Sequence, residues 1–120
     1  MPKLYGMHQL ELRPEVAPNV FERFVTDELR HLLQREGQRI YVLKGDRGER
    51  AGKYLFVFEY DSVEQRDRDT PASNQDSEEL KQWLADHEEQ VGRLFVQLST
   101  YVLPGWDIGE HYTDYVELSP

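Results

Sequence analysis

The order in which strand-like and helix-like patterns follow one another constrains the fold of this chain more than any other feature. Residues 4–12 alternate in part between two sides, as a strand requires. Apolar residues then recur at spacings of three and four over residues 18–33, which predicts an amphipathic helix ending near Gly37. Two runs rich in β-branched and aromatic residues follow, at 39–44 and 53–60, and together they predict a hairpin.

The next part of the chain carries two helix signals. Ser62 and Gln65 have the spacing of a capping box and predict a short helical turn that continues to about residue 69. Asp76 and Glu79 repeat that spacing before an apolar stripe over residues 80–98. We therefore expect one long second helix over that stripe.

The C-terminal part predicts further strands. Residues 100–103 have the pattern of a short strand, and residues 112–118 predict one more, either across a partner or at the sheet edge. The resulting order β-α-β-β-α-β predicts a ferredoxin-like α+β sandwich, in which an antiparallel sheet carries two helices on one face. A chain of 120 residues has the size of one domain, so we expect residues 1–120 to form it, with 104–120 as an extension or extra strand.

The run at residues 53–60 is apolar on both of its faces, which is typical of a central strand covered on both sides. Two helices on one face of the sheet leave the other face uncovered, and a second copy of the chain is the simplest cover. The pattern therefore predicts a homodimer. The two faces carry Tyr54, Phe56, Phe58 and Tyr60 on one side, and Leu55, Val57 and Glu59 on the other.

Charge and composition exclude several kinds of partner. The chain has 14 Lys and Arg against 23 Asp and Glu, for a net charge of −9, and this field repels phosphate backbones. There is no cysteine, so disulfides, thiolate metal ligands and a thiol nucleophile are excluded. The longest obvious apolar run, residues 54–58, is far below the roughly 20 residues of a membrane helix, and no secretory signal is evident. We expect a cytoplasmic protein without nucleic-acid or membrane partners.

The segments HQLELRPEVAPNVFERFVTDEL and YLFVFEYDSVEQRD resemble the first strand, first helix and third strand of the dimeric α/β-barrel superfamily. That superfamily includes antibiotic-biosynthesis-type monooxygenases, NIPSNAP-like and EthD-like proteins. The resemblance covers most of the chain and implies a homodimer whose two sheets close a barrel, with a pocket in each protomer between sheet and helices. The loop TPASNQD and the tail after Trp106 depart from the pattern, so a ligand is not carried over.

Haem-degrading members of this superfamily use an Asn on the first strand with a Trp and a His farther along. In this chain His8 and Gln9 occupy the first strand, while Trp83 and His87 stand one helical turn apart. Because the Asn is missing, the match is incomplete and we expect no cofactor.

Two histidines are the candidate catalytic bases. His8 lies among apolar neighbours on the first strand, and His87 lies on the apolar stripe of the second helix. In both cases a hydrogen-bonded core or rim histidine is the structural alternative. His111 has acidic neighbours, but solvated carboxylates explain them better than a metal site. The candidate substrate-binding residues are aromatic: Tyr5, Tyr41, Tyr54, Trp83, Tyr101 and Trp106.

Together these features predict a homodimer that binds a small aromatic or polyketide-like molecule. Cofactor-independent oxygenases and isomerases need only a dry pocket, one base and aromatic walls, so such an activity is one expectation. A non-enzymatic binding or stress-related dimer, whose aromatic residues pack the dimer core, is the alternative.

Overall fold

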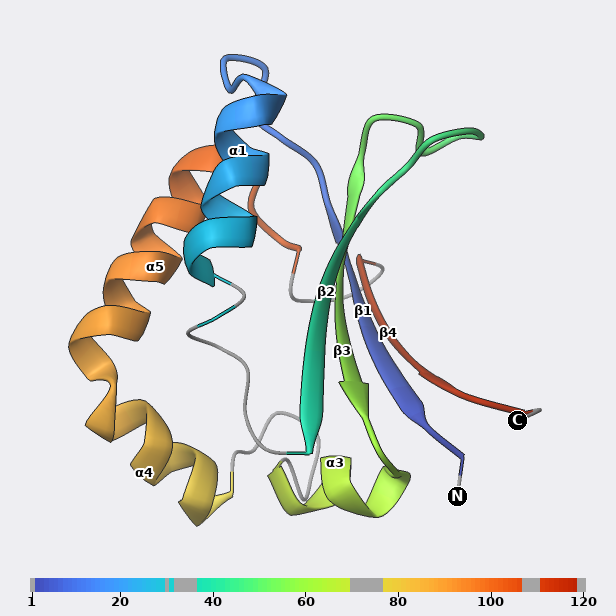
Figure 1. Cartoon of the computed structure of the whole chain (residues 1–120), viewed down its shortest axis with the longest axis vertical. Helices are drawn as coiled ribbons and strands as arrows, with labels where there is room; N and C mark the ends of the chain where they lie inside the picture. Colours follow the sequence, from blue (N-terminus) through green and yellow to red (C-terminus); the bar gives the residue numbers. More distant parts are fainter. Residues whose placement is uncertain (1, 30, 32–36, 70–76, 107–110, 119–120) are drawn as a thin grey trace.

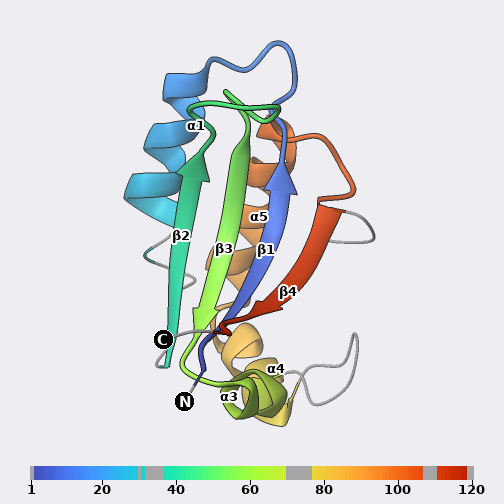
Figure 2. The ribbon, with the colours of Figure 1, turned by 90° about the vertical axis from the view of Figure 1, so that its right-hand side faces the viewer.

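The computed structural model describes residues 2–29, 31, 37–69, 77–106 and 111–118 of the chain. Within these residues the protein is a small α+β structure, with an antiparallel sheet of four strands in the order β2-β3-β1-β4 (Figure 2). This arrangement is compatible with the predicted ferredoxin-like sandwich. The strands are β1 (Leu4–Leu10), β2 (Gln38–Lys44), β3 (Tyr54–Tyr60) and β4 (Tyr112–Val116).

The main helices cover one face of the sheet (Figure 1). The first helix begins with α geometry and continues without a break as a π-helix, and the second half of the chain adds three α-helices. Short α3 and α4 lie toward the end of the sheet where the chain termini are, while α1 and α5 stand against the sheet. The helices are α1 (Pro18–Phe24), the π-helix η1 (Val25–Leu29), α3 (Val63–Asp69), α4 (Glu78–Asp86) and α5 (Glu88–Tyr101).

Strand β3 is central, as its pattern predicts. It pairs with β2 on one side and β1 on the other, and alternate residues on both of its faces are buried. Because successive side chains of a strand point to opposite faces, the core between sheet and helices takes one set of residues from each strand. That core is formed by Leu10, Phe21, Phe24, Val25, Leu29, Ile40, Tyr54, Phe56, Val91, Leu94, Leu98 and Val102.

The opposite face of the sheet bears no helix among the described residues, and we call it the helix-free face (Figure 2). Leu43 and Tyr115 on this face are each about half exposed, at 50% and 53%. The face therefore presents apolar and aromatic side chains to solvent in the single chain. Its apolar members are Tyr5, Met7, Tyr41, Leu43, Leu55, Val57 and Tyr115.

The prediction of a strand at residues 100–103 is wrong. Helix α5 continues to Tyr101, and only Val102 pairs with the first strand region, as an isolated bridge to Leu12. The ring of Tyr101 packs edge-on against Phe24 at a centroid distance of 5.2 Å, so packing on the first helix overrides the β-propensity of this segment. The fourth strand is β4, which pairs with β1 at the sheet edge and is one of the two predicted placements for residues 112–118.

The long second helix is also interrupted. His87 has φ −116° and ψ 20°, outside the helical region, and separates α4 from α5. The predicted N-cap at Asp76 lies outside the described residues, and Ser77 caps α4 by accepting a hydrogen bond from the Leu80 amide at 3.0 Å. The predicted cap at Ser62 is confirmed, since its hydroxyl accepts from the Gln65 amide at 3.1 Å.

The first helix is shorter in α geometry than its apolar spacing predicts. It changes to π geometry at Val25, and most of the residues after 29 in the predicted helix lie outside the described part. Gly37 has φ +78°, the left-handed conformation predicted for the helix end. Among the described helices, none has both the length and the apolar character needed to cross a membrane.

Candidate functional site

A cleft between the first helix and the β2 edge of the sheet is the candidate site, and we call it the Tyr54 cleft. Its volume is about 180 Å³. Its inner wall is apolar, because Phe21, Val25 and the ring of Tyr54 belong to the buried core. Its mouth is polar and carries opposite charges. The lining residues are Phe21, Glu22, Val25, Thr26, Val42, Lys44 and Tyr54.

Three polar side chains meet at the mouth of the cleft. The Tyr54 hydroxyl donates a hydrogen bond of 2.6 Å to Glu22 Oε2, and Lys44 Nζ donates one of 2.9 Å to the same oxygen. Lys44 Nζ also lies 5.8 Å from the centroid of the Tyr54 ring, which is within reach of a cation–π contact. The three groups come from α1, β2 and β3, so the fold brings them together across 32 residues of sequence.

The hydrogen bonds at the mouth determine which groups are charged. The donors Tyr54 and Lys44 lower the pKa of Glu22, so its carboxyl is ionised at neutral pH. Burial of the phenol, together with its bond to Glu22, raises the pKa of Tyr54, so this hydroxyl keeps its proton. The site therefore presents a carboxylate beside a protonated phenol and the ammonium group of Lys44, with the Glu22 and Lys44 side chains 42% and 49% exposed.

The change from α to π geometry occurs at this cleft. Glu22 and Phe21 stand in the last turn of α1, while Val25 and Thr26 open η1. The Thr26 hydroxyl donates to the Glu22 carbonyl at 3.0 Å, which holds the backbone of the turn that carries the carboxylate. π-helical turns are rare and often occur at functional sites.

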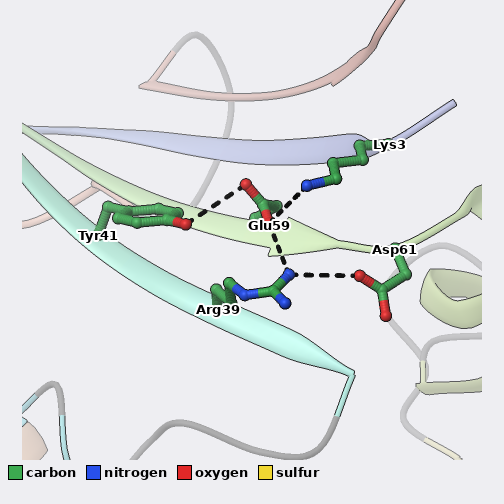
Figure 3. A network of polar contacts seen from close by, with 5 residues as sticks. All are labelled: Lys3, Arg39, Tyr41, Glu59 and Asp61. Atoms are coloured by element: carbon green, nitrogen blue, oxygen red, sulfur yellow. Dashed lines mark hydrogen bonds and ion pairs between the residues drawn. The ribbon is translucent and has the colours of Figure 1, made fainter. Parts of the chain in front are cut away.

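A second polar group lies on the helix-free face, and we call it the Glu59 cluster (Figure 3). The Glu59 side chain is only 8% exposed, and its Oε2 accepts from Arg39 Nη1 at 3.0 Å and from Lys3 Nζ at 3.4 Å. Arg39 also reaches Asp61 Oδ1 at 3.4 Å, and the Tyr41 hydroxyl lies 3.5 Å from Glu59 Oε1. A carboxylate with this little exposure needs such partners, because an unpaired buried charge is costly.

The predicted base His8 is half-buried on the helix side of β1 and surrounded by aromatic rings. It stacks on Tyr112 with ring centroids 4.4 Å apart, and it meets Trp106 edge-on at 5.4 Å. Its Nδ1 lies 3.3 Å from the Trp106 carbonyl oxygen. The structure therefore brings two of the predicted site residues, His8 and Trp106, into contact.

The second predicted base, His87, lies at the junction of α4 and α5. Its ring stacks on Trp83 at 4.6 Å, and its Nδ1 lies 2.9 Å from the Trp83 carbonyl oxygen. The expected proximity of these two residues is confirmed. Neither His87 nor His8 belongs to the lining of the Tyr54 cleft.

The remaining aromatic candidates are distributed over both faces of the sheet. Tyr5 and Tyr41 lie on the helix-free face, and Tyr5 is the cross-strand neighbour of Glu59. Tyr101 lines a cleft of about 270 Å³ between the first helix and α5, where its hydroxyl accepts from Gln97 at 3.1 Å. Of the six aromatic residues predicted to bind substrate, only Tyr54 lines the cleft that we named after it.

The polar surroundings predicted for His111 are described only in part. Asp107 and Glu110 lie outside the described residues, and Asp114 pairs with Arg66 at 2.5 Å. His111 itself lines a cleft of about 140 Å³ together with Arg50 and Trp106. Across the described part of the chain, no group of three or more His, Asp or Glu side chains is arranged to hold a metal ion.

Sequence reasoning missed Glu22, Lys44 and Glu59. The hairpin pairing places Lys44 directly opposite Tyr54, and this register is a signal that the sequence contains once the two strands are aligned. Nothing local marks Glu22, because a glutamate on a helix surface is common. No protein-family model, curated protein or solved structure matches the chain.

Proposed function

We propose that the protein is a homodimer that binds a small, partly apolar molecule in the Tyr54 cleft of each chain. The observation that carries this proposal is the meeting of Tyr54, Lys44 and ionised Glu22 at the mouth of an apolar cleft. Binding sites for small molecules typically have apolar walls and a few polar groups that fix the orientation of the ligand. A cleft between sheet and helices is also what the resemblance to the dimeric α/β-barrel superfamily implies.

The homodimer is proposed to form through the helix-free face, so that two ferredoxin-like sheets face each other. Its support is the exposure of apolar and aromatic side chains there, with Leu43 50% and Tyr115 53% exposed. Apolar and aromatic side chains that gather on one uncovered sheet face are typical of interfaces. The Glu59 cluster would then lie within the interface, where its internal ion pairs leave little uncompensated charge.

The Tyr54 cleft favours binding over proton abstraction. A general base works best when its pKa lies near the working pH, and hydrogen bonds hold the pKa of Glu22 below its ordinary value. The raised pKa of Tyr54 keeps that group a hydrogen-bond donor. We therefore propose non-enzymatic binding as the function of this cleft. Oxygenase or isomerase chemistry with His8 as the base is the second proposal.

The binding proposal is tested by amide chemical-shift mapping with a library of small aromatic and aliphatic compounds. We expect binders to shift the amides of Phe21, Val25 and Val42, and Lys44→Met to weaken binding several-fold. Lys53→Met is the matched control, because Lys53 pairs with Glu11 at 3.3 Å outside the cleft. Shifts confined to other surfaces, or equal affinities in both variants, would contradict the proposal.

A further inference from the structure

Both hydrogen bonds that Glu22 accepts within the described residues end on one oxygen. Tyr54 and Lys44 donate to Oε2, and no described residue donates to Oε1. Lys44 Nζ carries three hydrogens and, among the described residues, donates one of them, to Glu22. The mouth of the cleft thus offers a carboxylate oxygen and ammonium hydrogens side by side.

The floor of the cleft is apolar and closely packed. Phe21, Val25 and Tyr54 form that floor but are each at most 3% exposed, so an apolar group in the cleft meets mainly Val42, which is half-buried. At about 180 Å³ the cleft is smaller than the 300 to 1,000 Å³ that is typical of sites for drug-sized molecules. A ligand with a few apolar carbons below a compact polar head matches this shape.

The charges at the mouth determine the chemistry of that head. A lone ammonium would gain from Glu22 but meet the positive charge of Lys44, and a lone carboxylate would meet the reverse arrangement. A head that carries both charges satisfies both side chains through charge-assisted hydrogen bonds, which are about twice as strong as neutral ones. Lys44 Nζ and Glu22 Oε2 are only 2.9 Å apart, so the two charges of the ligand head must also lie close together. An α-amino acid meets this condition, because it carries its ammonium and carboxylate groups on one carbon.

We propose that the Tyr54 cleft binds an apolar α-amino acid as its zwitterion. The ligand ammonium donates to Glu22 Oε1, the ligand carboxylate accepts from Lys44 Nζ, and the apolar side chain packs on Val42, above the buried Phe21 and Val25. This inference rests on the proposed binding function of the same cleft and specifies the class of its ligand.

The test is isothermal titration calorimetry of the full chain with L-leucine and three truncated analogues. Isopentylamine lacks the carboxylate, 4-methylpentanoate lacks the ammonium, and glycine lacks the apolar side chain. We expect L-leucine to bind at least about tenfold more tightly than each analogue, because each analogue loses one charge-assisted bond or the apolar contact. Equal binding of L-leucine and either singly charged analogue would overturn the proposal, as would no binding of L-leucine.

Variants locate the binding. Glu22→Gln and Lys44→Met should each weaken L-leucine binding about tenfold or more, Lys44→Arg should retain most of it, and Lys53→Met should leave it unchanged. If Glu22→Gln does not fold, as judged by circular dichroism, the Lys44 pair of variants decides the matter. Unchanged affinity in Lys44→Met would overturn the proposal. Fragments that map to the cleft without L-leucine binding would refute the amino-acid ligand and leave the binding function standing.

Discussion

The hydrogen bond from Tyr54 to Glu22 joins a buried phenol to a half-buried carboxylate, and its removal should lower the stability of the fold. Tyr54→Phe removes only the hydroxyl, whose bond measures 2.6 Å. Hydrogen bonds to charged groups contribute about 1.5 to 3 kcal/mol, and because Glu22 is partly exposed we expect a loss of about 1.5 kcal/mol. Urea unfolding measures it. Tyr41→Phe is the control, because the contact of the Tyr41 hydroxyl with Glu59 measures 3.5 Å and is weak. An equal loss of stability in the two variants would contradict a stabilising bond between Tyr54 and Glu22.

The same phenol predicts how stability depends on pH. Burial and the bond to Glu22 raise the pKa of Tyr54 above its ordinary value near 10, so above about pH 10 the folded chain holds this proton and the unfolded chain releases it. The contribution of Tyr54 to stability is therefore complete below about pH 10 and is lost as the pH rises further. Urea unfolding between pH 9 and 11 should show a steeper decline for the wild type than for Tyr54→Phe. Parallel declines would refute this.

At the residue scale, the sequence identified one residue of the site, Tyr54, and missed its polar partners for a physical reason. Tyr54 was a candidate because an aromatic residue with a polar tip needs a partner when it is buried. Its partner Glu22 stands 32 residues away, and only the tertiary packing of α1 on the sheet brings the two together. Spacing in the sequence carries no such information.

At the element scale, the cap of α4 gives a direct prediction. The helix has no buried residue, so its own capping bond should matter for local order. Ser77→Ala removes the acceptor for the Leu80 amide and should lower the free energy of local opening of α4 by about 1 kcal/mol. Amide hydrogen exchange across Glu78–Asp86 measures this. Ser99→Ala, within α5, is the matched control, and equal effects of the two changes would contradict the prediction.

The order of elements was predictable because it depends on periodicity, which differs between helices and strands. Strands β1, β2 and β3, the central position of β3 and the cap at Ser62 follow the predicted pattern. Residues 100–103 were misassigned because Tyr101 and Val102 favour strands locally, while Tyr101 packs as helix against Phe24. The interruption at His87 has no such local signal, because the apolar stripe continues across it.

At the scale of the whole molecule, the helix-free face predicts self-association of the 14.2 kDa chain. Leu43→Lys places a charge on that face, where the wild-type side chain is 50% exposed, and should shift the proposed dimer toward monomer. Sedimentation equilibrium at micromolar concentration measures the shift. Val96→Lys is the control, because Val96 is 67% exposed on α5. Dissociation by the Val96 change alone would place the interface on the helices instead, and a monomeric wild type would refute the dimer.

The sequence pattern indicated an uncovered face but not the site. A strand that is apolar on both faces is visible in the order of residues, and it indicates that the face away from the helices needs a cover. The Tyr54 cleft depends on the relative placement of α1, η1 and β2, together with the change of helix geometry at Val25. These are properties of the packed molecule, and the spacing of residues in the sequence does not contain them.

The position of a bound ligand tests the central proposal most directly. Isotope-filtered nuclear Overhauser measurements on the labelled protein, with the tightest-binding compound of the library, report which methyl groups the ligand touches. We expect contacts from the ligand to the methyl groups of Val25 and Val42 in the Tyr54 cleft. Contacts to Val20 instead, in the cleft between the first helix and α5, would contradict it.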